Sequence, residues 1–305
     1  MKQWGSAGTF KRLDTGTTLY GTRVSRRTMA RVVFPFLNPV LAAVIRDIDQ
    51  ITGFGLSEAD EEPFLYFMRF LARPASSELL SWRADDDNRY WFDKVFKIVH
   101  DTQSSFACVN YHYANIYRLE SEVRVAVERH DFRSVIGDRS VFSGGNTRKL
   151  DFEYQAYVLA YRRCLEYLAI GLCGYFRIKS NSFKRLPRTL QNVRKKDRHV
   201  AAALSAVHAN FVEELAFVLS AETDPHSTRD LISHYEYVDA GVVNLTPHGF
   251  VLAGGGEGLL PRGLPLTQVL SNRLLVLREC ISQFIHTFVN SIEAGQPDVG
   301  AEPLR

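Results

Sequence analysis

The stretch Thr228–Tyr235 holds residue types at a spacing that could do chemistry. If it is helical, Asp230 and His234 stand four residues apart and are neighbours on one face. A carboxylate there can bind one imidazole nitrogen, which fixes the tautomer and leaves the other nitrogen for proton transfer. Arg229 and Ser233 form a second pair four residues apart. Arg229 and His234 would lie roughly 140° apart around the helix, so both could flank one groove.

These side chains suit phosphate binding and proton transfer. An arginine offers a fork of N–H donors that matches phosphate oxygens, and a histidine carries protons near neutral pH. The alternative is structural, because an exposed arginine and a hydrogen-bonded histidine are also common on ordinary surface helices.

Amphipathic helices must position this stretch, because apolar residues recur at helical spacing through most of the chain. Asp224-Pro225 is expected to start the helix that holds it, since aspartate accepts from first-turn amides and proline is tolerated at the first helical position. Two short apolar runs predict a small β-hairpin. The expected helices cover residues 36–52, 61–73, 77–82, 90–130 (as one or two helices), 149–176, 200–220, 225–239 and 266–292, and the expected strands cover 242–245 and 250–252. The predicted fold class is mainly α.

A dense run of loop-forming residues from Val135 to Arg148 marks the best internal boundary. We expect a helical region of unassigned role over residues 36–140 and a helical bundle with a β-hairpin insertion over 149–293. Residues 1–35 are expected to form a basic N-terminal arm, with a short strand as the alternative. Residues 294–305 are expected to form a flexible tail.

The clearest basic cluster follows the helix expected over residues 149–176. Its candidate RNA-binding residues are Lys184, Arg185, Arg188, Arg194, Lys195 and Lys196. Clustered cations suit a phosphate backbone, although a solvated loop is the competing interpretation. The formal net charge of the whole chain is only +3, so its sign alone says little about partners.

Four scattered cysteines, Cys108, Cys164, Cys173 and Cys280, lie within apolar helical patterns without metal-ligand spacing. We expect reduced, buried thiols in a cytoplasmic protein. No stretch is long and apolar enough to span a membrane, so no membrane association is expected. The run Asp85-Asp86-Asp87 is expected to be a solvated helix start, because no supporting ligands for a metal are visible.

The C-terminal half resembles the HEPN superfamily of helical bundles. The resemblance rests on Arg229-Asp230-Leu231-Ile232-Ser233-His234 between long helices, which fits the family's motif of an arginine, a polar residue and a later histidine. It covers roughly residues 150–293. Many HEPN proteins are metal-independent endoribonucleases that act as toxins of toxin–antitoxin pairs or as effectors of antiviral defence, and they usually dimerise.

The resemblance implies roles for the four candidate catalytic residues. Arg229 would bind and polarise the scissile phosphate, and His234 would assist proton transfer as the RNA 2′-hydroxyl attacks. Asp230 would orient either His234 or the arginine, and Ser233 would be a secondary polar contact. The expected partners are RNA, a second copy of the chain and an antitoxin or sensor protein, and no metal or other cofactor is expected. The alternative is a non-catalytic HEPN-like module that binds a nucleotide, nucleic acid or a partner protein.

Overall fold

The structure is a computed structural model, and it describes residues 39–130, 134, 142–143, 146–180, 182–220, 227–235, 237–246, 249–253 and 265–295. The helices are α2 (Pro39–Thr52), α3 (Glu58–Leu71), α4 (Ser77–Ser81), α5 (Asp86–Phe96), α6 (Asp101–Glu128), α8 (Arg148–Tyr175), α9 (Leu186–Leu190), α10 (Arg198–Phe211), α11 (Ala216–Leu219), α12 (Thr228–Asp230) and α13 (Leu266–Ala294), with 3-10 turns η2 (Pro74–Ser76) and η3 (Lys195–Asp197), and a π-helical turn η4 (Leu231–Tyr235). The prediction of a mainly α fold is confirmed. The predicted basic arm over residues 1–35, the Asp224-Pro225 helix start and residues 296–305 of the predicted tail lie outside the described residues.

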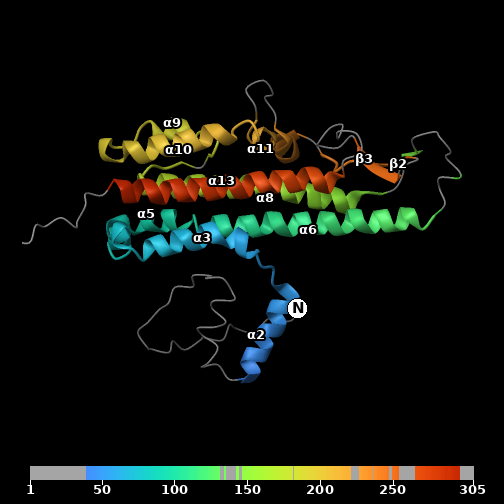
Figure 1. The fold of residues 1–305 in the computed structure, drawn as a ribbon, viewed down its shortest axis with the longest axis horizontal. Coiled ribbons are helices and arrows are strands. Elements are labelled where there is room, and N and C mark those ends of the chain that lie inside the picture. The colour runs from blue at the N-terminus through green and yellow to red at the C-terminus, as the bar shows by residue number, and fades with distance from the viewer. Residues whose placement is uncertain are drawn as a thin grey trace, which may run out of the picture.

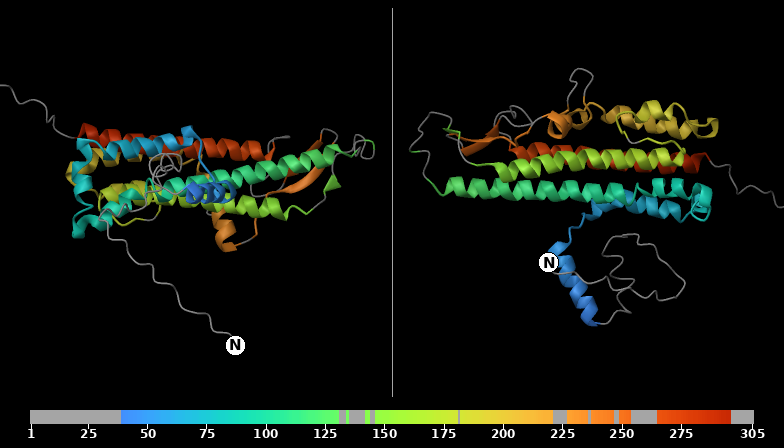
Figure 2. Two further views of the ribbon diagram at one scale, coloured as in Figure 1. Left: turned by 90° about the horizontal axis from the view of Figure 1, so that it is seen from below. Right: turned by 180° about the vertical axis from the view of Figure 1, so that it is seen from behind.

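The long helices run side by side in three layers (Figure 1). Helices α8 and α13 form the middle layer, with α3, α5 and α6 on one side and α9, α10 and α11 on the other. The right-hand view of Figure 2 shows the same order from behind. There, as in Figure 1, α2 stands apart from the layers. Helix α8 is therefore covered on more than one face, which explains why so many of its residues are buried.

Helices α6 and α8 are antiparallel and pack along most of their length. The Cys164 thiol of α8 lies 3.5 Å from the Thr102 carbonyl near the start of α6, while Glu153 near the start of α8 meets His112 further along α6. Helix α8 also presents a stripe of three fully buried tyrosines, Tyr154, Tyr157 and Tyr161. The last two donate hydrogen bonds to the carbonyls of Leu270 (3.0 Å) and Arg273 (2.8 Å) in α13, so their hydroxyls are satisfied inside the core, as core packing of this stripe requires.

One hydrophobic core joins residues from both sides of the loop signal at 135–148. Phe64, Phe106 and Ile116 come from the N-terminal side, and Leu165 and Phe284 come from the C-terminal side. The loop signal thus lies between two helices, α6 and α8, that pack against each other.

The predicted hairpin is confirmed, and it belongs to a sheet with a third strand. Strands β2 (Val242–Thr246) and β3 (Gly249–Ala253) pair antiparallel, with Thr246 opposite Gly249. Strand β1 (Phe142–Ser143) pairs antiparallel with β2. A two-residue strand has no alternation long enough to be read from a sequence, so β1 was not predicted.

Two predicted helices are wrong in extent. The helix expected over 200–220 ends at Phe211, because the amide of Ala216 bonds to the carbonyl of Glu213, three residues back, and the tighter turn separates α11 from α10. The helix expected over 225–239 begins only at Thr228 and ends at Tyr235. The acidic run is a helix start as predicted, since Asp85 is the N-cap of α5 and accepts from the Asp87 amide.

Cys164, Cys173 and Cys280 are buried free thiols, as predicted. The prediction is wrong for Cys108, which is exposed, because its side of α6 lies at the surface. Among the described residues, no helix combines the length and the apolar character that crossing a membrane requires.

Close approach of α8 to the α5–α6 turn predicts the effect of one substitution. A Cβ at Gly171 would lie 2.4 Å from Ile98 Cγ1 and 3.1 Å from the Ile98 amide nitrogen, so Gly171→Ala must displace backbone. We expect a loss of about 1–3 kcal/mol in the free energy of unfolding, measured by urea denaturation. The matched control is Gly55→Ala, where a Cβ meets nothing within 4 Å and a change within about 0.5 kcal/mol is expected. Equal stability of both variants would contradict the close packing.

Candidate functional site

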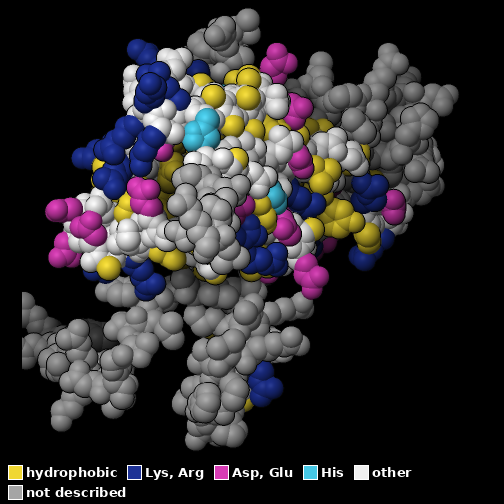
Figure 3. Space-filling model, turned by 60° about the vertical axis from the view of Figure 1, so that its left-hand side comes forward, with side chains coloured by type: hydrophobic (Ala, Val, Ile, Leu, Met, Phe, Trp, Pro, Cys, Tyr) yellow, Lys and Arg dark blue, Asp and Glu magenta, His cyan; other side chains and the backbone are white. Residues whose placement is uncertain are grey.

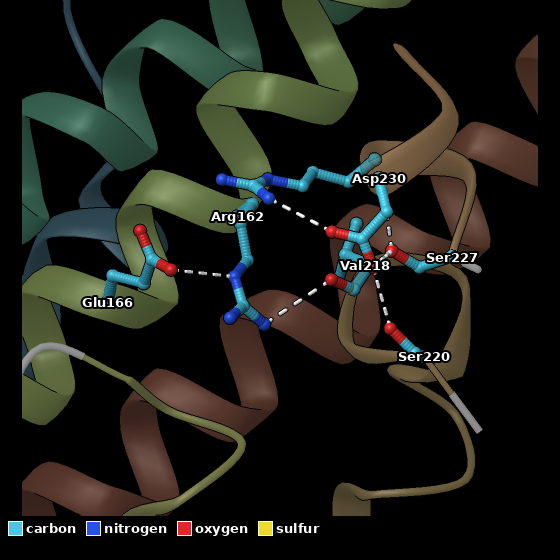
Figure 4. Close-up of polar contacts among 7 residues, drawn as sticks. Arg162, Glu166, Val218, Ser220, Ser227 and Asp230 are labelled. Carbon is cyan, nitrogen blue, oxygen red and sulfur yellow. Dashed lines mark hydrogen bonds and ion pairs between the residues drawn. The ribbon is translucent and has the colours of Figure 1, made fainter. Parts of the chain in front are cut away.

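The carboxylate of Asp230 is the polar centre of the predicted site. It accepts hydrogen bonds from the hydroxyls of Ser220 (2.7 Å) and Ser227 (2.9 Å) and from the guanidinium of Arg229 (2.9 Å). Ser227 is also the N-cap of α12, and its hydroxyl accepts from the Asp230 amide at 3.2 Å. Figure 4 shows these contacts converging on Asp230 from two short segments. The site is therefore built around a fixed anion that holds one arginine.

Helix α8 supports the segment that precedes α12. Arg162 of α8 donates from Nε to Glu166 (2.9 Å) and from a terminal nitrogen to the carbonyl of Val218 (3.3 Å) (Figure 4). That carbonyl lies near the end of α11, where orphan carbonyls need donors. Two residues later, Ser220 has a φ of 64°, and this backbone angle ends α11. The hydroxyl of Ser220 donates to the carboxylate of Asp230.

Helix α8 also supports the segment that follows the site. The buried carboxylate of Asp151 accepts from the amide of Ala240 at 2.9 Å and from the hydroxyl of Tyr237 at 3.3 Å. Gln155, one turn later, donates to the carbonyl of Val238 at 3.0 Å. Both flanks of Thr228–Tyr235 are therefore fixed on one rigid helix, which is a good platform for a site.

The predicted histidine lies on a π-helical turn that continues α12. Leu231 and Ile232 pack against the hydrophobic core, while Ser233 and His234 are exposed. A π-helical turn is closed by bonds between residues five apart, so positions 229 and 234 come closer to one face than in an α-helix. So short a helix makes few intrahelical bonds, and its form is set by its anchors at Asp230 and in the core.

The structure brings Arg229 and Asp230 together. The hydrogen bonds of the Asp230 carboxylate given above go to two serines and to Arg229, so Asp230 orients the arginine. The side chains of Arg229 and Asp230 are 27% and 26% exposed, so solvent reaches the pair.

Asp230 is held as an anion. Partial burial alone would raise the pKa of its carboxyl, but the hydrogen bonds from Ser220, Ser227 and Arg229 outweigh burial and lower the pKa to about 2. The carboxylate therefore keeps its charge, and its hold on Arg229, throughout the pH range in which proteins usually work.

The predicted RNA-binding cations lie along another part of the surface. All six are exposed, and they occupy the chain from Lys184 through α9 to η3. Figure 3 shows Lys and Arg side chains gathering at the upper left of the face at that end of the molecule. Arg194, Lys195 and Lys196 precede α10, and α11 and α12 follow it, so 14 residues of helix separate this end of the cluster from the site. At about 1.5 Å per residue, α10 alone is about 20 Å long.

Sequence reasoning missed Arg162, Ser220 and Ser227, although Ser227 had a signal. A serine followed three residues later by an acid is typical of a helix N-terminus. The chain contains the same arrangement at α3, where Ser57 is the N-cap, accepts from the Asp60 amide and donates to the Asp60 carboxylate. The contacts of Arg162 with Val218 and of Ser220 with Asp230 had no local signal, because the two partners lie 56 and 10 residues apart.

Among the described residues, no group of three or more His, Cys, Asp or Glu side chains is arranged to hold a metal ion.

The low pKa of Asp230 predicts a pH-dependent effect of Asp230→Asn. An aspartate has a pKa of about 3.9 in an unfolded chain, so the folded carboxylate contributes stability above pH 4 and loses it as pH falls towards 2. We expect the variant to be about 1 kcal/mol less stable at pH 7, a value discounted for partial exposure, and the difference to vanish near pH 2. Urea denaturation at several pH values measures it, with the exposed Asp93→Asn as control. A difference that stays constant down to pH 2 would refute the assigned interactions.

Comparison of the chain with protein-family models, with curated proteins and with solved structures finds no match. The chemistry of the site therefore rests on its own residues and geometry.

Proposed function

We propose that this protein is a metal-independent endoribonuclease of the HEPN type, with Arg229 and His234 as its catalytic residues. The observation that carries the proposal is the pairing of Arg229 with an anchored carboxylate on a short helix that also exposes Ser233 and His234. A toxin or an antiviral-defence effector is the role that this activity suits best.

Arg229 is suited to hold the scissile phosphate. The Asp230 carboxylate accepts from one terminal nitrogen of its guanidinium, which restrains the side chain, and a guanidinium carries five N–H donors in all. A restrained fork binds a phosphate with less loss of conformational freedom than a mobile one. Placed against a phosphate, Arg229 would also stabilise the negative charge that grows on the oxygens during attack.

His234 is suited to move a proton. The reaction requires a base for the 2′-hydroxyl proton and an acid for the leaving 5′-oxygen, and it yields a 2′,3′-cyclic phosphate and a 5′-hydroxyl. An exposed imidazole can serve as either group near neutral pH. Because one chain supplies a single His234, a homodimer that faces two copies of the site would supply both groups. Ser233, exposed beside His234, would contact the substrate.

The second candidate is a module that binds nucleic acid, a nucleotide or a partner protein without turnover. The placement of the Arg194–Lys196 end of the basic cluster before α10, a helix about 20 Å long, and of the site after it favours this candidate, because binding can then occur without any part played by His234. Under the ribonuclease proposal, the same cations would hold the RNA on either side of the cleaved bond.

Substitution of Arg229 and His234 tests catalysis. The parent protein should cleave total RNA in the presence of EDTA, and Arg229→Ala and His234→Ala should each lower the rate by about 100-fold or more. Arg229→Lys should restore little, because an ammonium lacks the planar fork. Cleavage is measured by gel electrophoresis, and the ends are identified by their cyclic phosphate.

Matched controls are Arg163→Ala and His100→Ala, two exposed residues away from the site, which should leave cleavage unchanged. Circular dichroism should show the parent's helix content in every variant. If the variants at positions 229 and 234 cleave RNA as fast as the parent, the assignment of Arg229 and His234 as catalytic residues is wrong. Binding without cleavage by the parent would favour the second candidate.

Substitution of the basic cluster tests its role in RNA binding. We expect the triple variant Arg194→Ala, Lys195→Ala, Lys196→Ala to bind single-stranded RNA more weakly. The plot of log affinity against log salt should lose about 2 in slope, at about 0.7 for each phosphate contact. Fluorescence anisotropy at several salt concentrations measures this. The control is Arg118→Ala, Arg124→Ala, Arg129→Ala on the exposed side of α6, and an equal loss in both triples would mean that the cluster has no special role.

A further inference from the structure

A second group of reactive side chains lies on the other side of α8, between α6 and α8. Cys108 and His112 stand four residues apart on α6, and Glu153 projects from α8. The Nδ1 atom of His112 lies 2.6 Å from a carboxylate oxygen of Glu153, and Cys108, one helical turn before His112, places its thiol on the same face of α6. A thiol, an imidazole and a carboxylate are therefore neighbours, which is the set of groups that activates a nucleophile.

The order of the three groups fixes what each can do. A carboxylate only accepts, so Nδ1–H of His112 donates to Glu153, and Nε2 is then the acceptor of the neutral ring. The hydrogen bond with Cys108 raises the pKa of His112, burial lowers it, and the hydrogen bond with Glu153 raises it again, with a net rise. The imidazole is thus prepared to take and hold the proton of the thiol.

Cys108 differs from the other three cysteines in its access to solvent. Its side chain is exposed, whereas Cys164, Cys173 and Cys280 are buried. Burial raises the pKa of the Cys173 thiol to about 11 and also raises the pKa values of the Cys164 and Cys280 thiols, which keeps all three protonated and inert. A reagent in solution therefore meets one thiol with a base beside it.

The surroundings decide between the reactions open to such a thiol. Acyl transfer needs donors for a tetrahedral oxyanion, but the amides around Cys108 lie inside the 28-residue helix α6 and are bonded to helix carbonyls. Thiol–disulfide exchange has no oxyanion to stabilise and needs only a thiolate with access to a sulfur. Tyr111 packs edge-on to His112 at 5.4 Å and to Phe54 at 5.5 Å, and both aromatic side chains are partly exposed, so an adduct would find apolar surface beside it.

We propose that Cys108 is a modification site, a nucleophilic thiol that His112 and Glu153 activate for exchange with low-molecular-weight disulfides. The proton of Cys108 moves to His112, and the thiolate attacks one sulfur of the disulfide. A new S–S bond forms at Cys108 as the S–S bond of the reagent breaks, and the departing thiolate takes the proton from His112. Cys108 is oxidised to a mixed disulfide and the reagent is reduced to one thiol, so atoms and electrons balance. This chemistry does not depend on the proposed ribonuclease activity.

Glutathione disulfide is the probe that tests the proposal. The folded parent is incubated with it at pH 7, and intact mass and peptide mapping follow the adduct. We expect one adduct per chain, at Cys108, and none in Cys108→Ser. The initial rate should fall about threefold or more in His112→Gln and in Glu153→Gln, because thiolate supply falls more than nucleophilicity rises.

Two controls separate activation from a structural effect. His100→Gln removes another imidazole of α6, one that also lies 2.6 Å from a carboxylate, that of Asp101, and its rate should equal the parent's. At pH 9.5 a thiol of ordinary pKa is ionised without a base, so the parent and His112→Gln should react equally there. Among the described residues, the titratable groups on which this thiol acts are His112 of α6 and Cys164 of α8, and Glu153 of α8 faces His112. An adduct elsewhere, or equal rates in the parent and His112→Gln at pH 7, would overturn the proposal.

Discussion

The fold depends on the close packing of α8 against the helices around it. Gly174 and Gly171 let α8 approach α5 and the α5–α6 turn, where an added Cβ would fall 2.7 Å from Lys94 Cβ and 2.4 Å from Ile98 Cγ1. On another face, the buried tyrosines of α8 reach carbonyls of α13. Because α8 is fixed on these faces, it can hold the residues before and after α12 with Arg162, Asp151 and Gln155. The packing of α8, in the middle of the chain, thereby positions a site that begins more than 50 residues after this helix ends.

Buried carboxylates connect the helices at points where apolar contact alone would leave amides unsatisfied. Glu120 of α6 is 3% exposed and accepts from the amide of Thr267 at 3.0 Å. That amide belongs to the first turn of α13, where intrahelical acceptors are missing and negative charge is favoured. The buried carboxylate of Asp151 likewise accepts a hydrogen bond from the amide of Ala240. Such contacts specify one register between helices, because a shift of one turn would leave a charge buried without its donors.

The sequence was sufficient wherever a local pattern determines structure. Apolar spacing located the long helices and the hairpin, and Asp85 marked a helix start, because these features depend on neighbours along the chain. It was insufficient wherever a distant contact determines structure. The break after Phe211, the short helix at Thr228 and the exposure of Cys108 depend on which faces meet, and no periodicity encodes this. For the site, the sequence predicted the residue types but left open whether Asp230 orients Arg229 or His234. The serines that hold the Asp230 carboxylate, and the α8 contact to the segment before α12, became visible only in three dimensions.

Two helices in this chain begin with a serine N-cap and an aspartate three residues later, and each aspartate binds an arginine. The two arginines differ in what they connect. At α3, Asp60 is 5% exposed and pairs with Arg278 of α13, 218 residues away, so the pair joins two helices inside the protein. At α12, Asp230 pairs with Arg229, its neighbour in sequence, so that pair joins nothing distant. A partly exposed ion pair between neighbours adds only about 0–1 kcal/mol to stability. The fold therefore has little need of Arg229, and its restrained, solvent-accessible guanidinium meets the requirement of the proposed phosphate binding.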